Sequence, residues 1–231
     1  MSPTGLCRCK GRGQFCHAFC RPTCPPMKVP RLTLVMGPQD CPDGSFDEVL
    51  SASLRAGLPA FQYRVKDHNI RKELAPKVLE LLRGHETQLS VNDDPALAYQ
   101  MQSDILHLGQ DDMDLASARE IIGGNMILGL SIRNEEEARA CSPLAQYAGV
   151  GPVFGTASKD DAAPTLGPKR ARAIADMVAI PVVFIGGINH DNLAELEIGP
   201  NEGVAVISAI ASSHDPEQAS LALLQQLAER S

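Results

Sequence analysis

Polar residues suited to binding and catalysis follow nearly every short apolar segment of this chain. Gln62, Arg64 and Lys66 alternate at the end of one segment, so the two-residue period of a strand points their side chains to one side. Two cations and one amide on that side suit an anionic ligand with a polar ring. A surface salt-bridge ladder is the structural alternative, but strand ends of parallel barrels seldom form such surfaces.

Acidic residues follow the next two segments. Asn92 and Asp93 end one of them, and Asp112 comes shortly after the other. Two carboxylates on neighbouring strand ends repel each other unless a cation or a proton lies between them. Mg2+ favours one or two carboxylates completed by water and substrate phosphate, so Asp93 and Asp112 are predicted metal ligands. The alternative, that Asp94 and Asp111 simply cap helices, suits Asp94 and leaves the other pair unexplained.

Three later segments are suited to phosphate groups. They are Gly155-Thr156-Ala157-Ser158-Lys159 in the longest loop, Gly186-Gly187-Ile188-Asn189, and Ile207-Ser208-Ala209-Ile210. Hydroxyls and backbone N–H groups beside a lysine suit a phosphate or a diphosphate, and paired glycines let the backbone approach a ligand closely. Thr156, Ser158, Lys159, Gly187, Ile207 and Ser208 are therefore candidate ligand-binding residues.

Two anion sites and one divalent metal site imply a pair of substrates, one carrying a diphosphate and the other a monophosphate. The sequence contains no Ser-His-Asp arrangement, paired zinc motif or Walker loop. Without an activated nucleophile, we favour transfer of an electrophilic carbon with diphosphate as the leaving group. His107 lies inside an apolar segment, where a histidine is more often a hydrogen-bonded core residue than a catalyst.

The elements that must position these residues alternate eight times between strand and helix. The predicted strands cover 32–36, 60–64, 88–91, 104–108, 126–130, 146–150, 182–185 and 204–207. The predicted helices cover 46–55, 70–83, a stretch after Pro95, 115–122, 135–140, a stretch from Pro168, 192–196 and 216–228. This pattern predicts a parallel (β/α)8 TIM barrel with its active site on the rim formed by the strand ends. An open doubly wound sheet would place a glycine-rich turn after the first strand, and Gly37-Pro38-Gln39-Asp40 fits that poorly.

The composition fits one such barrel. The chain has 231 residues, and barrels of this type commonly have about 250. Hydrophobic residues make up 44% and aromatic residues 4%, and tryptophan is absent, so the core must be aliphatic.

The charge of the chain is unevenly distributed. Residues 1–31 carry six basic side chains and no acid, and subtracting these from the net charge of −7 leaves −13 for residues 32–231. Such an acidic body argues against general nucleic-acid binding. No apolar run is long enough for a membrane span and no secretory signal is recognisable, so we predict a cytoplasmic protein.

The first 30 residues differ from the rest. Five of the seven cysteines lie within the first 24 residues, with His17 among them, but not in the paired spacing of structural zinc sites. A disulfide cluster would need an oxidising compartment, for which the rest of the sequence gives no support. We predict that residues 1–30 are a disordered basic tail, or lie upstream of a true start near Met27, and that residues 31–231 form a single catalytic domain.

The ordered motifs resemble those of thiamine phosphate synthase over about residues 32–228. They are Gln62-Tyr63-Arg64-Val65-Lys66, Val91-Asn92-Asp93, His107-Leu108-Gly109-Gln110-Asp111-Asp112, Gly129-Leu130-Ser131, Gly151-Pro152-Val153-Phe154-Gly155-Thr156-Ala157-Ser158-Lys159, Gly186-Gly187-Ile188 and Val206-Ile207-Ser208-Ala209-Ile210. The resemblance implies a barrel that joins hydroxymethylpyrimidine diphosphate to a thiazole or carboxythiazole phosphate, releasing diphosphate. The implied reaction is dissociative: diphosphate leaves, a pyrimidine carbocation forms, and the thiazole nitrogen captures it.

The resemblance also implies a role for each matching residue. Gln62, Arg64, Lys66, Asn92 and Lys159 would hold the pyrimidine diphosphate, Asp93 and Asp112 would bind Mg2+, and Ser131 would face the pyrimidine. Thr156, Ser158, Gly187, Ile207 and Ser208 would hold the thiazole phosphate. Arg64, Lys159 and Ser131 are the predicted catalytic residues. Ser158 stands where many relatives have threonine, which keeps the hydroxyl, and the first strand lacks a tyrosine common there.

Two alternative functions remain at this point. A thiazole tautomerase of the same superfamily would be expected to carry histidine at position 131 and often has eroded metal carboxylates, whereas this chain has Ser131, Asp93 and Asp112. A non-catalytic regulator would act through the cysteine-rich tail. The predicted partners are small-molecule substrates, without nucleic acid or membrane, and the oligomeric state is left open, a homo-oligomer included.

Overall fold

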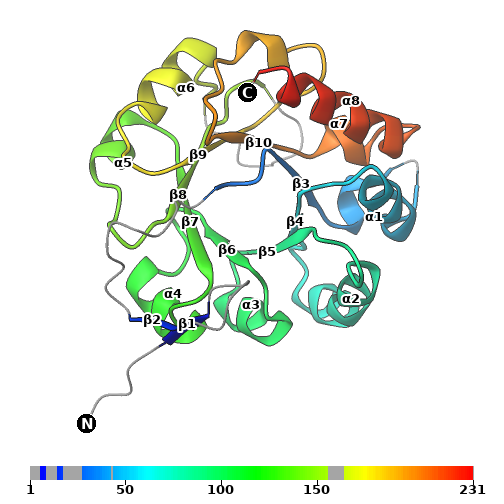
Figure 1. The fold of residues 1–231 in the computed structure, drawn as a ribbon, viewed down its shortest axis with the longest axis horizontal. Helices are drawn as coiled ribbons and strands as arrows, with labels where there is room; N and C mark the ends of the chain where they lie inside the picture. Colours follow the sequence, from blue (N-terminus) through cyan, green and yellow to red (C-terminus); the bar gives the residue numbers. More distant parts are fainter. Residues whose placement is uncertain (1–5, 9–14, 18–27, 43, 156–163, 231) are drawn as a thin grey trace.

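The computed structural model describes residues 6–8, 15–17, 28–42, 44–155 and 164–230. These residues contain a closed barrel of eight parallel strands in the order β10-β3-β4-β5-β6-β7-β8-β9 (Figure 1). The strands are β3 (Leu32–Met36), β4 (Ala60–Tyr63), β5 (Gln88–Asn92), β6 (Ile105–Leu108), β7 (Ile127–Ile132), β8 (Tyr147–Val150), β9 (Val182–Ile185) and β10 (Gly203–Val206). The predicted TIM-barrel fold is confirmed, and the open doubly wound sheet is excluded because β10 pairs with β3.

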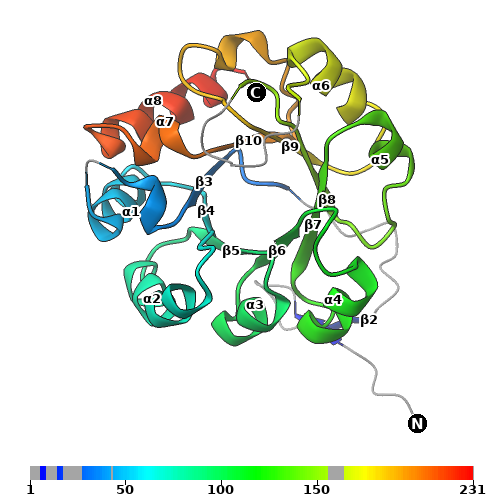
Figure 2. The same ribbon diagram turned by 180° about the vertical axis from the view of Figure 1, so that it is seen from behind.

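Helices surround the barrel on its outside, as both face-on views show (Figure 2). They are α1 (Phe46–Arg55), α2 (His68–Leu81), α3 (Pro95–Met101), α4 (Leu115–Ile122), α5 (Glu135–Arg139), α6 (Pro168–Ala175), α7 (Ser208–Ala211) and α8 (Pro216–Ala228), with the 3-10 turns η1 (Pro38–Asp40) and η2 (Leu193–Glu195). Side-chain caps set several helix starts, including Ser45 for α1, Asp114 for α4 and Asp215 for α8. These local signals explain why α1, α4 and α8 begin where the sequence predicts.

Two predicted helices differ from the structure for local reasons. The helix predicted from residue 70 begins at His68 because Asp67 accepts hydrogen bonds from the amides of Asn69 and Ile70. The helix predicted over 192–196 is only the turn η2. There the side chains of Asn189 and Asn192 bond to nearby backbone amides, which competes with regular helix formation.

Strand alternation separates the barrel into an outer and an inner set of side chains. Leu32, Leu34 and Met36 of β3 face outward and belong to the large core between the strands and the helices. A second cluster lies inside the barrel, formed by Val29, Val35, Ile105, Tyr147, Val183 and Ala205. Polar residues also face inward, since Thr33, Gln62, Ser90 and His107 are all buried. The barrel interior therefore carries a polar layer towards the strand ends.

The segment before β3, residues 28–31, packs against the barrel near the amino ends of its strands. Val29 is only 8% exposed and packs with the inner cluster. Arg31 donates hydrogen bonds to the carbonyls of Gly199, Glu202 and Leu227. In Figure 1 this blue segment crosses the middle of the barrel. We propose that the catalytic domain begins near Lys28 rather than at residue 31, because Val29 fills the barrel interior.

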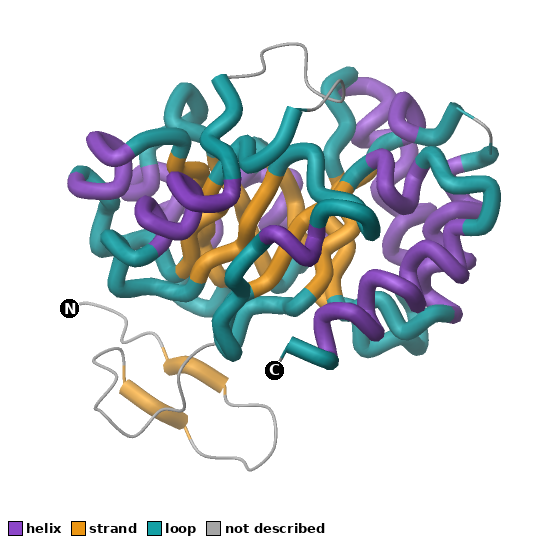
Figure 3. The backbone as a smooth tube through the Cα atoms, turned by 90° about the horizontal axis from the view of Figure 1, so that it is seen from above, coloured by secondary structure: helices purple, strands orange, loops and turns teal. Residues whose placement is uncertain are grey.

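A small antiparallel sheet lies outside the barrel. Strands β1 (Leu6–Arg8) and β2 (Phe15–His17) pair with each other and not with the barrel (Figure 3). The predicted disorder of the tail falls largely on residues outside the described part of the chain and stays a prediction. Within the described residues, no helix is both long and apolar enough to span a bilayer.

Candidate active site

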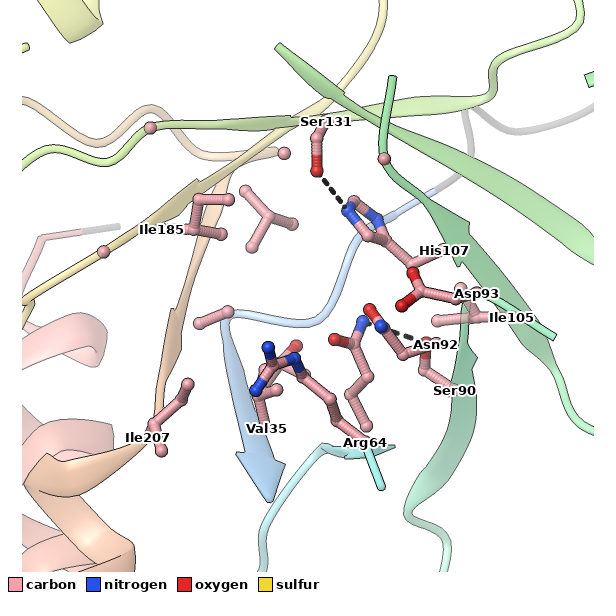
Figure 4. Close-up of a pocket in the computed structure, with 18 of the residues that line it drawn as sticks. Val35, Arg64, Ser90, Asn92, Asp93, Ile105, His107, Ser131, Ile185 and Ile207 are labelled. Carbon is pink, nitrogen blue, oxygen red and sulfur yellow. Dashed lines mark hydrogen bonds between the residues drawn. The ribbon is translucent and has the colours of Figure 1, made fainter. Parts of the chain in front are cut away.

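The carboxyl ends of the strands surround a cavity of about 500 Å³ (Figure 4). Ten predicted site residues line it: Gln62, Arg64, Lys66, Asn92, Asp93, Asp112, Ser131, Gly187, Ile207 and Ser208. They come from six different strand ends, so the barrel brings distant parts of the sequence to one rim. Thr156, Ser158 and Lys159 lie outside the described residues.

The cationic side of the cavity is built at the end of β4. Gln62 is buried, while Arg64 and Lys66 continue the same inward face beyond the strand. The Arg64 carbonyl accepts a hydrogen bond from Gln39 Nε2, and its amide donates to the Met36 carbonyl, so this strand end is tied to the loop after β3. Figure 4 shows the Arg64 side chain reaching into the cavity.

Asp93 occupies an unusual backbone position at the end of β5. Its φ of 65° lies in the left-handed region, which residues other than glycine rarely adopt. Its amide donates to the His107 carbonyl, and the Asp94 amide donates to the Asn92 carbonyl across it, forming a tight three-residue turn. Backbone strain of this kind tends to occur where function requires a particular side-chain direction. Here the turn places the Asp93 carboxylate at the cavity.

Two neighbours hold this turn. Asp94 caps α3 by accepting a hydrogen bond from the Leu97 amide, as predicted, and its other carboxylate oxygen lies 3.4 Å from Arg71 Nη2. The Arg71 side chain is only 16% exposed and also lines the cavity. Arg71 therefore joins α2 to the strand end that carries Asp93.

Asp112 lies on the neighbouring strand end, after β6. Its carboxylate accepts a 2.6 Å hydrogen bond from the Gly109 amide, which fixes the loop that carries it. The suggestion that Asp111 caps a helix is wrong, because Asp114 caps α4 and Asp111 forms an ion pair with Arg133. Asp93 and Asp112 thus both reach the cavity from adjacent strands, as the sequence predicted.

A chain of hydrogen bonds lies beneath the polar side of the cavity. Gln62 Nε2 donates to Ser90 Oγ at 3.3 Å, and the Ser90 hydroxyl lies near that of Tyr147. The Tyr147 hydroxyl lies 2.7 Å from His107 Nδ1, and His107 Nε2 lies 2.9 Å from Ser131 Oγ. Burial raises the pKa of Tyr147 well above its ordinary value, and the nearby Ser90 hydroxyl offsets this only in part. Tyr147 is therefore a neutral hydroxyl at physiological pH.

The far side of the cavity is built from closely packed backbone. Gly186 and Gly187 have φ values of 94° and 64°, and a side chain at Gly187 would meet the Phe154 carbonyl oxygen at 2.8 Å. The Val153 and Phe154 amides donate to the carbonyls of Ile185 and Gly186. Glycine is needed here both for the backbone conformation and for the close approach of the two loops.

Sequence reasoning missed several residues of this cavity. Arg71, Ser90, Arg133 and Tyr147 line it, and His107 bonds directly to the predicted site residue Ser131. Ser90 could have been found, because it precedes the predicted site residue Asn92 by two positions on the same strand. Arg71 gave no such signal, since it lies on a helix and reaches the cavity only through the fold.

A (β/α)8 barrel whose rim gathers cations, two carboxylates and a phosphate-suited glycine pair defines a class of enzymes that act on phosphorylated substrates. A family model described as thiamine monophosphate synthase matches residues 32–210. The chain belongs to that family.

Individual relatives agree with this assignment. The chain is 41% identical to the thiamine-phosphate synthase of Geobacillus thermodenitrificans, in a match that covers 84% of this chain and 90% of the relative. It is 40% identical to the thiamine-phosphate synthase of Archaeoglobus fulgidus, in a match that covers 78% of this chain and 85% of that relative. It superposes on thiamine phosphate pyrophosphorylase from Pyrococcus furiosus with a TM-score of 0.75 and 31% identity, over 87% of this chain and 96% of that one. A 3-hexulose-6-phosphate synthase, at 14% identity and a TM-score of 0.61, shares the fold.

Proposed function

We propose that this barrel joins hydroxymethylpyrimidine diphosphate to a thiazole phosphate, producing thiamine phosphate and releasing diphosphate. The main support is that ten of the predicted site residues, spread from position 62 to position 208, line one cavity at the strand ends. The family assignment supports the same activity, because the two sequence relatives are named thiamine-phosphate synthase and the Pyrococcus furiosus structure is named thiamine phosphate pyrophosphorylase. The thiazole substrate is either the free or the carboxylated form.

Each side of the cavity suits one part of the substrate pair. Arg64, Lys66 and Asn92 hold the diphosphate, with Lys159 contributing from the loop after β8. Gln62 and Ser131 face the pyrimidine ring from the polar inner layer. Gly187, Ile207 and Ser208, with Thr156 and Ser158, hold the thiazole phosphate on the opposite side. This division keeps the two anionic groups apart and brings the two rings together between them.

The residues at the rim fit Mg2+. Asp93 and Asp112 offer oxygen ligands from adjacent strand ends, next to the cations that would hold the diphosphate. The described residues contain no group of three or more histidine, cysteine or acidic side chains that could hold a metal by themselves. Two carboxylates completed by water and substrate oxygens are typical of Mg2+. When bound, Mg2+ neutralises charge on the diphosphate.

The protein groups favour departure of the diphosphate before the new bond forms. Arg64 and Lys159 stabilise the negative charge that develops on the leaving group. The polar layer with Gln62 and Ser131 holds the pyrimidine in place while its exocyclic carbon becomes cationic. The thiazole nitrogen then forms the carbon–nitrogen bond, because both rings are held in one enclosed cavity.

The decisive experiment measures diphosphate release by the purified protein supplied with both substrates and Mg2+. We expect release that depends on both substrates. Asp112→Ala and Lys159→Ala should each lower kcat at least a hundredfold, because Asp112 would hold Mg2+ and Lys159 would contact the diphosphate, and both stabilise the charge of the leaving group. The free energy of unfolding should change by less than about 1 kcal/mol in each variant. Full activity in both variants would refute the assignment.

Other properties of the protein follow as proposals. The rival tautomerase activity predicts conversion of a thiazole carboxylate without any need for the pyrimidine substrate, which the same assay distinguishes. We further propose that the enzyme acts in the cytoplasm on freely diffusing substrates, either as a single chain or as a homo-oligomer. Size-exclusion chromatography with light scattering measures the oligomeric state.

A further inference from the structure

The hydrogen-bond chain beneath the cavity has a direction that can be worked out from its members. At one end Gln62 donates an amide hydrogen to Ser90 Oγ. Ser90 is 1% exposed, and its hydroxyl lies near the Tyr147 oxygen, where it lowers the pKa of Tyr147. The direction is decided at Tyr147, whose buried hydroxyl has one hydrogen to donate.

The same counting continues to the other end. Tyr147 is buried, and His107 Nδ1 at 2.7 Å is the acceptor that the described hydrogen bonds give its hydroxyl, so the Tyr147 hydrogen goes there. A neutral histidine that accepts at Nδ1 carries its hydrogen on Nε2, and His107 Nε2 then donates to Ser131 Oγ at 2.9 Å. Ser131 receives this bond and keeps its own hydroxyl hydrogen for another partner. In the reverse direction His107 Nδ1 would carry the hydrogen, and the described hydrogen bonds would leave the Tyr147 hydrogen without an acceptor.

The barrel is shaped to hold the two rings of this chain. A side chain at Gly129 would collide with the Tyr147 ring, and one at Gly149 would lie 2.8 Å from His107 Cε1. The His107 and Tyr147 rings lie 5.5 Å apart between centroids, tilted by 38°. Strands β7 and β8 therefore leave room on the barrel interior where these rings fit, and the rings cannot easily take other positions.

We propose that His107 and Tyr147 are positioning residues that make Ser131 a hydrogen-bond donor towards the substrate ring. This inference rests on the proposed function, in which Ser131 faces the pyrimidine. A fixed donor selects a ring that presents an acceptor atom, such as an unprotonated ring nitrogen, at that point. Gln110 Nε2 bonds to the Ser131 carbonyl at 2.6 Å, which holds the serine backbone in place as well.

The direction of the chain is tested by the tautomer of His107. Two-bond 1H–15N correlation spectra of protein labelled in its six histidines distinguish the two neutral tautomers, and His107→Gln identifies the signal by its loss. We expect the Nε2–H tautomer in the unmodified protein. In Tyr147→Phe the donor to Nδ1 is gone, so the signal should move towards the Nδ1–H form. Tyr99→Phe, which removes a hydroxyl from a side chain that is 63% exposed, should leave the signal unchanged.

The link to Ser131 is tested by a double-mutant cycle. Tyr147→Phe should lower kcat/KM for the pyrimidine substrate roughly threefold to tenfold, the effect of losing one neutral hydrogen bond. In a Ser131→Ala background the same change should have almost no further effect, since Tyr147 acts through Ser131. Equal effects of Tyr147→Phe in both backgrounds would overturn the proposal, because a purely structural role does not depend on Ser131.

Finding the Nδ1–H tautomer of His107 in the unmodified protein would overturn the proposal as well. The spectra need neither substrate nor turnover, so the tautomer result decides the direction of the chain even if the unmodified protein releases no diphosphate. Absence of diphosphate release would refute the proposed function on its own.

Discussion

Asp93 shows how a single residue can be placed against its own conformational preference. Its left-handed backbone costs on the order of 1 kcal/mol or more. The structure keeps that conformation through the backbone bond to His107 and through Asp94, which both caps α3 and pairs with Arg71. A residue that touches no substrate can therefore determine where the carboxylate of its neighbour points.

Replacing Asp94 tests this placement. Asp94→Ala should destabilise the fold by about 1 kcal/mol through loss of the helix cap, and should also lower kcat at least tenfold, because the turn that carries Asp93 is released. Asp215→Ala is the matched control, since Asp215 caps α8 through the Gln218 amide and does not line the cavity. Urea unfolding and the diphosphate assay measure the two effects. Similar activity in both variants would count against a role for Asp94 beyond capping.

Asp40 provides a pH-dependent test near the cationic side. Burial raises the pKa of its carboxyl, and the Gly37 amide and the nearby Arg64 offset this only in part. A carboxyl whose pKa is raised by folding stabilises the fold below its unfolded pKa of about 3.9 and loses that contribution as the pH rises through the folded value.

Asp40→Asn should therefore unfold at higher denaturant concentration than the unmodified protein at pH 7, with the difference shrinking as the pH falls towards 4. The asparagine oxygen can still accept the hydrogen bond from the Gly37 amide. Unfolding free energies measured between pH 4 and 8 give the comparison. A less stable variant at pH 7 would show that the ionised carboxylate contributes more than its burial costs.

At the scale of elements, two loop backbones pack directly against each other. The loop after β8 bonds to the end of β9, and the conformation of Gly187 makes this approach possible. Gly187→Ala should destabilise the fold by roughly 1–3 kcal/mol, because a side chain there is strained and meets carbonyl oxygens of the adjacent loop. Gly124→Ala is the control, because an added Cβ there has no heavy atom within 4 Å. Its free energy of unfolding, measured in urea, should differ from that of the unmodified protein by less than about 0.5 kcal/mol.

The elements were predictable to different degrees, for physical reasons. Apolar alternation and end signals such as Ser45 located the strands and α1, because those signals are local. The sequence also predicted that Asp93 and Asp112 reach one rim, because parallel strands deliver their ends to the same side. Arg71 could not be predicted, since its contact with Asp94 joins a helix to a strand end. The length of η2 depended on Asn side chains bonding to backbone amides, which apolar spacing does not reveal.

At the scale of the whole molecule, the barrel depends on the segment that precedes its first strand. Deleting residues 1–26 should leave diphosphate release and stability unchanged, because Val29 and Arg31 keep their contacts. Deleting residues 1–31 should lower the unfolding free energy by at least about 2 kcal/mol, since it empties the place of Val29 and removes the Arg31 hydrogen bonds. Thermal unfolding of both shortened proteins measures this. An inactive but folded 27–231 chain would instead favour a functional tail.

The path of residues 28–31 also decides how this enzyme can be attached to a surface. The chain enters β3 at the amino ends of the strands, whereas Arg64 and Asp112 follow the carboxyl ends of β4 and β6. A linker fused ahead of Lys28 would therefore anchor the protein by the amino ends of its strands, leaving the rim at the carboxyl ends turned towards the solution. Immobilised in that orientation, the catalyst should turn over as fast as it does when free.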